Sequence, residues 1–221
     1  MKVLVIDVGG THVKLKLQGS DEVRKCPSGP DLTPKAMVEA VRGATAGWDF
    51  DAITIGYPGP VLRGQILVEP VNLGKGWVGF NFEAAFRHPV KIINDAAMQA
   101  LGSYDGGRML FLGLGTGLGS TLIYDYVLAP MELGHLPYKK GRTFEEYVGN
   151  AGLKRLGRKK WQGVVFDVVS RLKHALLAEY IVLGGGNVKK LAELPPGCRA
   201  GDNSNAFVGG VRLWEEPPHR V

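Results

Sequence analysis

The chain lacks any run of eighteen apolar residues, the length that a membrane-spanning helix needs. It also lacks a basic leader before a cleavable apolar segment, because its first residues, Val3–Ile6, already have the composition of a strand. We therefore expect a cytoplasmic protein that does not bind a membrane.

Cysteine is scarce. Only Cys26 and Cys198 occur, far apart in the sequence, and neither belongs to a Cys-x-x-Cys pair. Disulfide frameworks and thiolate metal sites need several cysteines at suitable spacing, so neither is predicted. We expect both thiols to be buried and inert.

Two common nucleotide-binding patterns are also missing. The sequence has no Gly-x-x-x-x-Gly-Lys-Ser/Thr, and Gly113-x-Gly115-x-Gly117-x-Gly119 has the wrong spacing for Gly-x-Gly-x-x-Gly. These absences argue against the P-loop and Rossmann classes.

The composition does provide for a core, since 45% of the 221 residues are hydrophobic and 22% are charged. The net charge of +6 is uneven, because ten Lys or Arg but only three Asp or Glu lie between Lys139 and Lys173. The basic segment 154–160 within this region is either a solvated helix face or a track for a polyanion. It lacks interleaved exposed aromatic residues and matches no nucleic-acid-binding motif, so we expect no nucleic-acid partner.

The order of the predicted elements repeats along the chain. A strand at 3–7, a glycine turn and the alternating strand His12–Leu17 are matched by a strand at 109–112, a glycine turn and the strand Ser120–Tyr124. We therefore predict an α/β protein of two similar lobes with a cleft between them. The predicted division is residues 1–105, joined by a C-terminal helix at 205–221, and residues 106–204.

The other elements follow from the same patterns. Further strands are predicted at 22–25, 52–55, 90–93 and 180–183. Helices are predicted from Thr33-Pro34, from Ala96 to Leu101, from Thr143 and from Trp161.

Two glycine turns are candidates for binding phosphate. Gly9-Gly10-Thr11 and Gly115-Thr116-Gly117 let backbone N–H groups approach an anion, because no glycine Cβ intrudes. Plain hairpins use the same residues, so each turn alone leaves both roles open.

Two aspartates follow predicted strands, at positions where open α/β sheets bind ligands. Asp7 is a candidate ligand of Mg²⁺, directly or through water, or a residue that caps the turn. Asp95 is a candidate general base, or the N-cap of a helix that starts at Ala96.

Two later segments have suitable chemistry for a sugar and a phosphate. Glu132-Leu133-Gly134-His135 places a carboxylate near an imidazole, and both groups can bond neighbouring hydroxyls. Val182–Asn187 runs from a strand into three glycines, so backbone there can approach a phosphate or a flat ligand, or simply turn.

In this order, these motifs resemble those of the ROK family of sugar kinases within the actin-like ATPase superfamily, most closely its bacterial polyphosphate glucokinases. The resemblance spans nearly the whole chain, and the segments 70–77, 146–149 and 194–214 favour the polyphosphate branch. It implies the actin-like ATPase (ribonuclease H-like) fold and a homodimer. It also implies transfer of a phosphoryl group to a hexose, with glucose favoured and glucose 6-phosphate formed.

The resemblance assigns roles to individual residues. Asp95 is implied to be the catalytic base, and Asp7, the candidate Mg²⁺ ligand, lies in the segment that resembles the family's first phosphate motif. The sugar is bound by Gly59, Asn72, Asn94, Asp95, Glu132, His135 and Glu145. The donor phosphates or nucleotide are bound by Asp7, Gly9, Gly10, Thr11, Lys14, Gly115, Thr116, Gly117, Gly184, Gly185, Gly186 and Asn187. Many family members hold zinc through a cysteine cluster after Glu-x-Gly-His, which is missing here, so no structural zinc is expected.

Several alternatives stay open. The donor is ATP, polyphosphate or both, because His12 stands where many relatives have lysine, whereas Lys14 matches the basic residue of the polyphosphate-using branch. Mannose and N-acetylglucosamine are alternative acceptors. A non-catalytic sugar or nucleotide sensor is the alternative to an enzyme, since fold alone does not prove chemistry.

Overall fold

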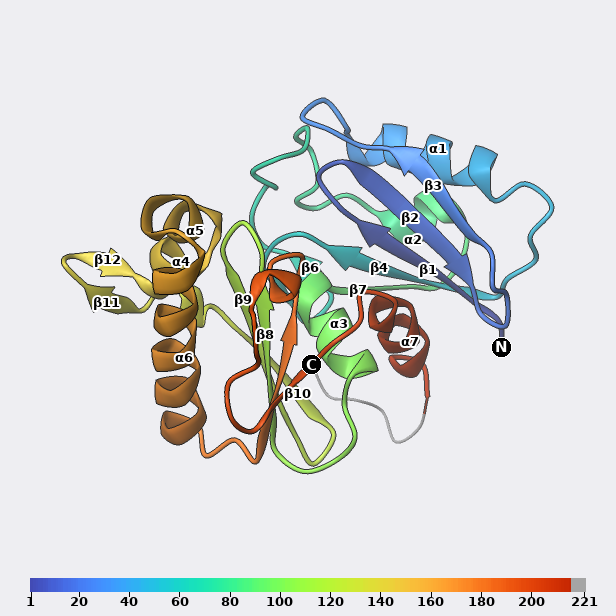
Figure 1. Cartoon of the computed structure of the whole chain (residues 1–221). Helices are drawn as coiled ribbons and strands as arrows, with labels where there is room; N and C mark the ends of the chain where they lie inside the picture. Colours follow the sequence, from blue (N-terminus) through green and yellow to red (C-terminus); the bar gives the residue numbers. More distant parts are fainter. Residues whose placement is uncertain (216–221) are drawn as a thin grey trace.

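The structure, a computed structural model, describes residues 1–215 and contains two five-stranded sheets with helices packed on them (Figure 1). The first sheet has the strand order β3-β2-β1-β4-β7. Its central strand β1 pairs antiparallel with β2 and parallel with β4. The strand bounds are Val3–Val8 (β1), His12–Leu17 (β2), Val23–Pro27 (β3), Ala52–Tyr57 (β4) and Val90–Asn94 (β7).

The second sheet repeats this arrangement, with the strand order β10-β9-β8-β13-β14. Its central strand β8 pairs antiparallel with β9 and parallel with β13. The bounds are Met109–Leu114 (β8), Leu118–Tyr124 (β9), Val127–Met131 (β10), Tyr180–Gly184 (β13) and Cys198–Ala200 (β14). The predicted α/β class is confirmed, and each glycine turn joins the first two strands of its sheet.

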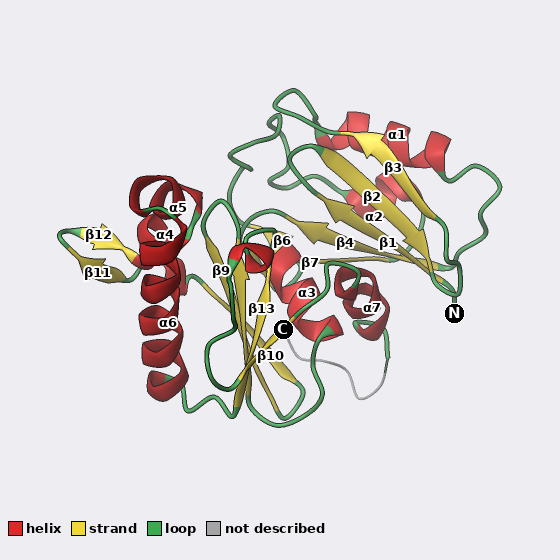
Figure 2. Ribbon diagram, viewed as in Figure 1, coloured by secondary structure: helices red, strands yellow, loops and turns green. Residues whose placement is uncertain are grey.

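Helices and short hairpins complete the chain (Figure 2). The helices are Pro34–Ala44 (α1), Phe82–Phe86 (α2), Asp95–Gly102 (α3), Phe144–Val148 (α4), Asn150–Leu156 (α5), Arg158–Ala175 (α6) and Asn205–Arg212 (α7). Short 3-10 turns cover Leu133–His135 (η1) and Val188–Lys190 (η2). The hairpins are Val61–Leu62 with Gln65–Ile66 (β5, β6) and Pro137–Lys139 with Arg142–Thr143 (β11, β12).

Local sequence explains several of these elements. The alternation in β2 buries Val13, Leu15 and Leu17 on one face, as a strand with one covered face requires. In α1, the Thr33 side chain accepts a hydrogen bond from the Ala36 N–H at 3.3 Å, so the predicted cap is confirmed.

Other predicted bounds were wrong. α6 begins at Arg158 instead of Trp161, and α3 begins at Asp95 instead of Ala96. The helix predicted at 205–221 ends at Arg212, and residues 216–221 of that prediction lie outside the described residues. The sequence analysis missed the short elements β10, β14, α2 and α5, because five or fewer residues, or seven in α5, carry little periodicity.

Helices α3 and α7 lie at the junction of the two sheets (Figure 1). One buried apolar cluster includes residues of both helices together with Val5 of the first sheet and Phe111 and Ile123 of the second. α3 also forms the covalent connection between the sheets, because it follows β7 and precedes β8. Its position is therefore fixed from both sides.

The two helices touch backbone to backbone. A Cβ added to Gly102 of α3 would lie 1.8 Å from the Asn205 carbonyl oxygen, and one added to Gly209 of α7 would lie 1.8 Å from the Met98 carbonyl oxygen. Beyond the helix, the Trp214 Nε1–H donates to Thr54 Oγ1 at 2.8 Å, and Thr54 Oγ1–H donates to the Gly210 carbonyl at 2.6 Å. These bonds fix α7 on the first sheet.

Cys26 is buried and Cys198 is half-buried, so the expectation of two buried thiols holds only for the first. Burial raises the pKa of both thiols, that of Cys198 to about 11. None of the helices within residues 1–215 combines the length and apolarity needed to span a bilayer.

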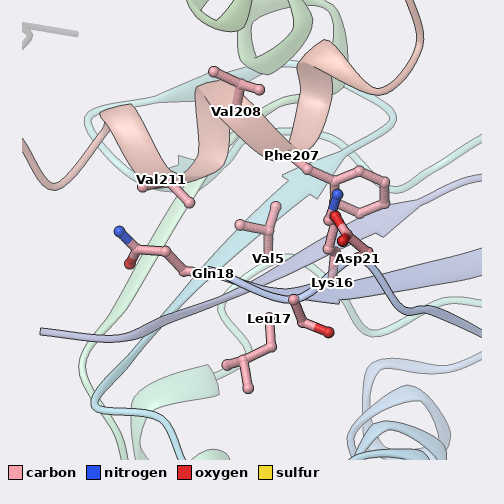
Figure 3. Close-up of a pocket in the computed structure, with 10 residues that line it drawn as sticks. Val5, Lys16, Leu17, Gln18, Asp21, Phe207, Val208 and Val211 are labelled. Carbon is pink, nitrogen blue, oxygen red and sulfur yellow. The ribbon is translucent and has the colours of Figure 1, made fainter.

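A hollow of about 290 Å³ lies between the end of β2 and α7, and Figure 3 shows the side chains that line it. Phe207, Val208 and Val211 line its helical side, and Lys16 and Gln18 lie across from them. None of the residues predicted to bind sugar or phosphate lines this hollow. The candidate site lies elsewhere, at the glycine turns.

The close approach of α3 and α7 predicts that the stability of the fold is sensitive to any side chain added at their contact. Gly209→Ala should lower the free energy of unfolding by about 1–3 kcal/mol, because the added methyl group meets backbone that cannot yield easily. Gly43→Ala in α1 is the matched control, since an added Cβ there meets nothing within 4 Å, and it should stabilise by about 0.5–1 kcal/mol. Denaturant unfolding measures both, and equal effects of the two substitutions would contradict the packing argument.

Candidate active site

The junction of β7 and α3 determines where Asp95 lies. Asn94 is the N-cap of α3, because its Oδ1 accepts a hydrogen bond from the Ala97 N–H at 3.0 Å. The capping role considered for Asp95 was therefore wrong, and Asp95 is the first helical residue. The Asn94 Nδ2 group also donates to the Gly59 carbonyl at 3.0 Å, which leaves one amide hydrogen for a ligand.

The Asp95 carboxyl group has an unusually high pKa for an aspartate. Burial, then the charge of Asp7 and, more weakly, that of Glu132 raise its pKa to about 7, although its Oδ1 accepts from the Ala96 N–H at 2.7 Å. The charges of Asp7 and Glu132 thus both act on the Asp95 carboxyl group. A carboxyl group that titrates near neutral pH is suited to accepting a proton.

Asp7 and Lys14 face each other across the first hairpin. They are paired in the register of β1 and β2, and Lys14 Nζ lies 3.4 Å from Asp7 Oδ2. Burial raises the pKa of Asp7, and the Lys14 charge offsets part of that increase. The structure gives Asp7 a lysine partner in place of the turn N–H that a capping role requires.

The first glycine turn is a short hairpin with an exposed tip. The Gly9 N–H donates to the His12 carbonyl at 3.1 Å, and Ser28 Oγ–H donates to the Gly9 carbonyl at 2.6 Å. Gly10 and Thr11 are exposed. A Cβ added to Gly10 would lie 3.6 Å from the Asn72 Cβ, so the turn lies beside a residue predicted to bind the sugar.

The second glycine turn is held more firmly. The Gly115 N–H donates to the Gly117 carbonyl at 3.2 Å, and the Asn150 N–H lies 3.1 Å from the Gly115 oxygen and 3.2 Å from the Thr116 oxygen. The buried Asn187 donates from Nδ2 to the Gly115 carbonyl at 3.0 Å and to Asn150 Oδ1 at 2.9 Å. The Asn187 amide group is thus engaged within the protein and supports the turn.

The glycines before Asn187 differ in their surroundings. Gly184 is buried, and a Cβ added there would lie 2.4 Å from the Phe111 ring, so its close contact is with the core. Gly185 has a φ of +85°, a backbone conformation that favours glycine. Gly186 is exposed and has open space around it. Of the three, Gly186 is best placed to meet a ligand.

Two of the residues predicted to bind the sugar, His135 and Glu145, lie beside the second turn. His135 Nε2 lies 3.8 Å from Glu145 Oε1, and a Cβ added to Gly117 would lie 2.5 Å from Glu145 Oε2. Glu132 is exposed at the start of η1, and its carbonyl accepts from the His135 N–H at 3.1 Å. The Thr143–Glu146 capping box begins α4 and so fixes the backbone of Glu145.

The residues around the first glycine turn and those around the second come together at the start of α3. A Cβ added to Gly119, at the start of β9, would lie 2.9 Å from the Ala96 Cβ. The structure thus brings Asp95 next to the second turn, as well as near Asp7 and Glu132. Asn187 and Gly184, by contrast, are buried, the first against the Gly115 carbonyl and the second against the Phe111 ring.

We compared the chain with known proteins. No family model matches it. The polyphosphate glucokinase of Mycobacterium tuberculosis is 27% identical over 216 residues, which cover 86% of this chain and 80% of that protein. The structure of the inorganic polyphosphate/ATP-glucomannokinase of Arthrobacter sp. strain KM has a TM-score of 0.78 at 24% identity, covering 95% of this chain and 96% of that one. The structure of a ROK family glucokinase from Streptomyces griseus, in complex with glucose and AMPPNP, has a TM-score of 0.72 at 18% identity. The match covers 96% of this chain and 99% of that one.

The chain has the fold of the ROK sugar kinases. The resemblance and the actin-like ATPase fold predicted from the sequence are both confirmed. Within this ROK fold, residues 1–215 contain no group of three or more His, Cys, Asp or Glu side chains that could enclose a metal ion. A cation held mainly by one carboxylate, water and donor phosphates needs no such group.

The sequence analysis missed two residues whose side chains hold loops of the candidate site in place. Ser28 bonds the first glycine turn, and the Glu69 carboxylate accepts three backbone N–H groups in the loop that carries Asn72. Neither residue belongs to a periodic or spaced motif. Ser28 lies 19 residues from its partner, so no local signal could have found it.

The raised pKa of Asp95 predicts a pH-dependent stability difference. The unfolded chain loses this proton near pH 3.8 and the folded chain near pH 7, so ionisation destabilises the fold increasingly between these values. Asp95→Asn removes this effect and should stabilise the protein above pH 7, by at most about 4 kcal/mol at about 1.4 kcal/mol per pKa unit. The difference should vanish near pH 4.

Denaturant unfolding at pH 4, 6 and 8 measures this difference. The exposed Asp49→Asn is the matched control and should change the free energy of unfolding little across the range. If Asp95→Asn and the parent protein are equally stable at pH 8, the Asp95 carboxylate is ionised in the folded state without cost and the argument fails.

Proposed function

We propose that the chain is a hexokinase-type phosphotransferase that forms glucose 6-phosphate from glucose, with polyphosphate or ATP as the donor and Asp95 as general base. The observation that carries the proposal is the position of Asp95. Its carboxyl group has a pKa of about 7, and it lies near Asp7 and Glu132 at the start of a helix that meets the second glycine turn. The similar proteins are named a polyphosphate glucokinase and a ROK family glucokinase, and a glucokinase catalyses this reaction.

The acceptor binds among polar groups that suit adjacent hydroxyls. The remaining Asn94 amide hydrogen donates, the Glu132 and Glu145 carboxylates accept, and the His135 imidazole does either. Gly59 and Asn72 complete this side of the site. Glucose is the proposed acceptor because it is the sugar in the names of the similar glucokinases. Mannose is the second candidate, since one similar structure is a glucomannokinase.

The reaction needs little covalent chemistry from the protein. Asp95 accepts the proton of the terminal sugar hydroxyl while that oxygen bonds to the outer phosphorus of the donor, and the bond from this phosphorus to the rest of the donor breaks. Backbone N–H groups of Gly9–Thr11 and Gly115–Gly117 stabilise the phosphate oxygens, and Lys14 adds a positive charge. The site positions the two reactants for in-line transfer.

Magnesium fits the acidic side of this site. Burial raises the pKa of Asp7, and the Asp7 charge raises that of Asp95, so a cation here would relieve an unfavourable accumulation of negative charge. We propose that Asp7 holds Mg²⁺, directly or through water, together with donor phosphates. When bound, Mg²⁺ supplies charge neutralisation on the donor.

The surface cations favour polyphosphate as one donor. Within the segment 154–160, Arg155 donates to the Glu146 carbonyl at 2.8 Å, and Arg158 donates to the Lys190 carbonyl. Lys154, Lys159 and Lys160 are exposed and make no ion pair with any side chain of residues 1–215. Positive charges on one surface raise the local concentration of a long polyanion more than that of a short nucleotide.

The remaining features of the proposal are the location, the oligomeric state, which the family resemblance implies, and the division into lobes. We propose a cytoplasmic homodimer, and lobes formed by residues 1–105 with α7 and by residues 106–204. Light scattering on the purified protein tests the oligomeric state. The three buried apolar clusters support the lobes, because one belongs to the first sheet, one to the second, and one joins them.

The first test supplies Mg²⁺ and glucose with ATP or polyphosphate in parallel and measures glucose 6-phosphate with a coupled dehydrogenase. Asp95→Asn should lower kcat by about 10²–10⁴-fold, and kcat/KM of the parent protein should rise with pH until the Asp95 carboxyl group ionises near pH 7. Asp49→Asn should leave both unchanged. Near-normal turnover by Asp95→Asn would exclude it as the base, and no product with either donor would favour a sensor.

The donor proposal makes a separate prediction. Lys159→Gln with Lys160→Gln should raise the KM for polyphosphate severalfold at low salt and leave the KM for ATP unchanged, because only the long donor reaches this surface. The matched control neutralises the exposed Lys2 and Lys35 in the first part of the chain. Equal changes for both donors, or for both pairs of substitutions, would show that the segment is a solvated helix face.

A further inference from the structure

One acidic side chain closes the loop that carries Asn72. The Glu69 carboxylate accepts hydrogen bonds from three consecutive backbone N–H groups: Oε2 from Gly76 at 3.0 Å and Trp77 at 3.1 Å, and Oε1 from Val78 at 3.2 Å. Bonds from N–H groups to an ionised carboxylate are among the stronger hydrogen bonds in proteins. The two ends of the loop 69–78 are therefore tied together by a single side chain.

The base of this loop is also fixed to the first lobe. The Leu32 carbonyl accepts from the Gly74 N–H at 3.1 Å and from the Trp77 indole at 3.3 Å. The Trp77 ring is fully buried, and its centroid lies 5.5 Å from that of Tyr57. The Tyr57 hydroxyl donates to the Val68 carbonyl at 2.9 Å, directly before Glu69.

The tip of the loop is different, because solvent surrounds it. Val71 is 95% exposed, and Asn72 is exposed beside it. The contact that places this tip in the site is with the first glycine turn, where a Cβ added to Gly10 would lie 3.6 Å from the Asn72 Cβ. Leu73, directly after Asn72, is buried in the apolar cluster of the first sheet. The exposed tip is therefore held between this anchor and the three bonds that the Glu69 carboxylate accepts at the far end of the loop.

We propose that Glu69 is a positioning residue for the sugar acceptor, which holds the loop 69–78 in the shape that places Asn72 beside the first glycine turn. This inference rests on the proposed function, because it assigns Asn72 to the acceptor site. Glu69 touches neither reactant. Substitution of Glu69 releases the tip of the loop but leaves Asp95 and the second glycine turn unchanged. A smaller fraction of the molecules then has the loop shape that binds the acceptor, and the apparent affinity for the acceptor falls in proportion to that fraction.

The experiment combines hydrogen exchange with steady-state kinetics on the full chain. Glu69→Ala should accelerate amide exchange in residues 70–78 and raise the KM for glucose about 10- to 100-fold, with kcat and the KM for the donor within about threefold of the parent values. Glu69→Gln keeps one acceptor oxygen and should give an intermediate KM, and it serves as well if the alanine variant folds poorly. Circular dichroism checks folding.

Glu83→Ala is the matched control. Its carboxylate also accepts a backbone N–H in the first lobe, from Val90 at 3.2 Å, but outside this loop. It should leave the KM for glucose and the exchange of residues 70–78 unchanged.

Each other outcome overturns the inference in a distinguishable way. Faster exchange with an unchanged KM for glucose would mean that Glu69 holds the loop without positioning the acceptor. Unchanged exchange would mean that the three bonds do not hold the loop. A parent protein that phosphorylates no hexose would overturn the proposed function and, with it, the role of Asn72, whatever the exchange data show.

Discussion

The direct backbone contact between α3 and α7 is the constraint on which the rest of the structure depends. Gly102 and Gly209 bring the helix axes closer than any side chain would allow, and both helices then pack into the apolar cluster between the sheets. Because α3 begins with Asp95, this contact also determines where the candidate base lies. A catalytic group must be placed to a fraction of an ångström, and a buried helix is a more rigid support than a loop.

The candidate site is acidic, although the chain as a whole has a positive net charge. The protein carries a charge of +6, yet the negative charges of Asp7 and Glu132 act on Asp95 at the candidate site. Lys14 is the cation that contacts Asp7. An acidic centre repels phosphate, so a cation and the N–H groups of the glycine turns are needed before a donor can approach it. This arrangement separates the proton acceptor from the phosphate-binding groups while keeping them within one site.

The sequence predicted the parts of the fold that depend on local patterns. The alternation in β2, the Thr33 cap and the two glycine turns were identified correctly because neighbouring residues determine them. It failed where partners lie far apart in the chain. The Asn187 side chain bonds Gly115, 72 residues away, and Ser28 bonds Gly9, 19 residues away. Such bonds exist only after the strands have assembled. The cap of α3 is a local bond between Asn94 and the Ala97 N–H, but Asn94 and Asp95 are adjacent and both are favoured caps, so the pattern alone did not choose between them.

The equivalence of the two sheets extends to α3 and α7. Each follows the last strand of its own sheet, α3 after β7 and α7 after β14, and each also packs against the other sheet, α3 on β8 and β9 and α7 on β1. Two halves that exchange a terminal helix resemble a domain-swapped dimer joined into one chain. Neither half then covers its own sheet alone. The close approach of Gly102 and Gly209 is therefore where the helix that each half contributes to the other sheet meets its counterpart, so loosening it would expose apolar surface on both sheets at once.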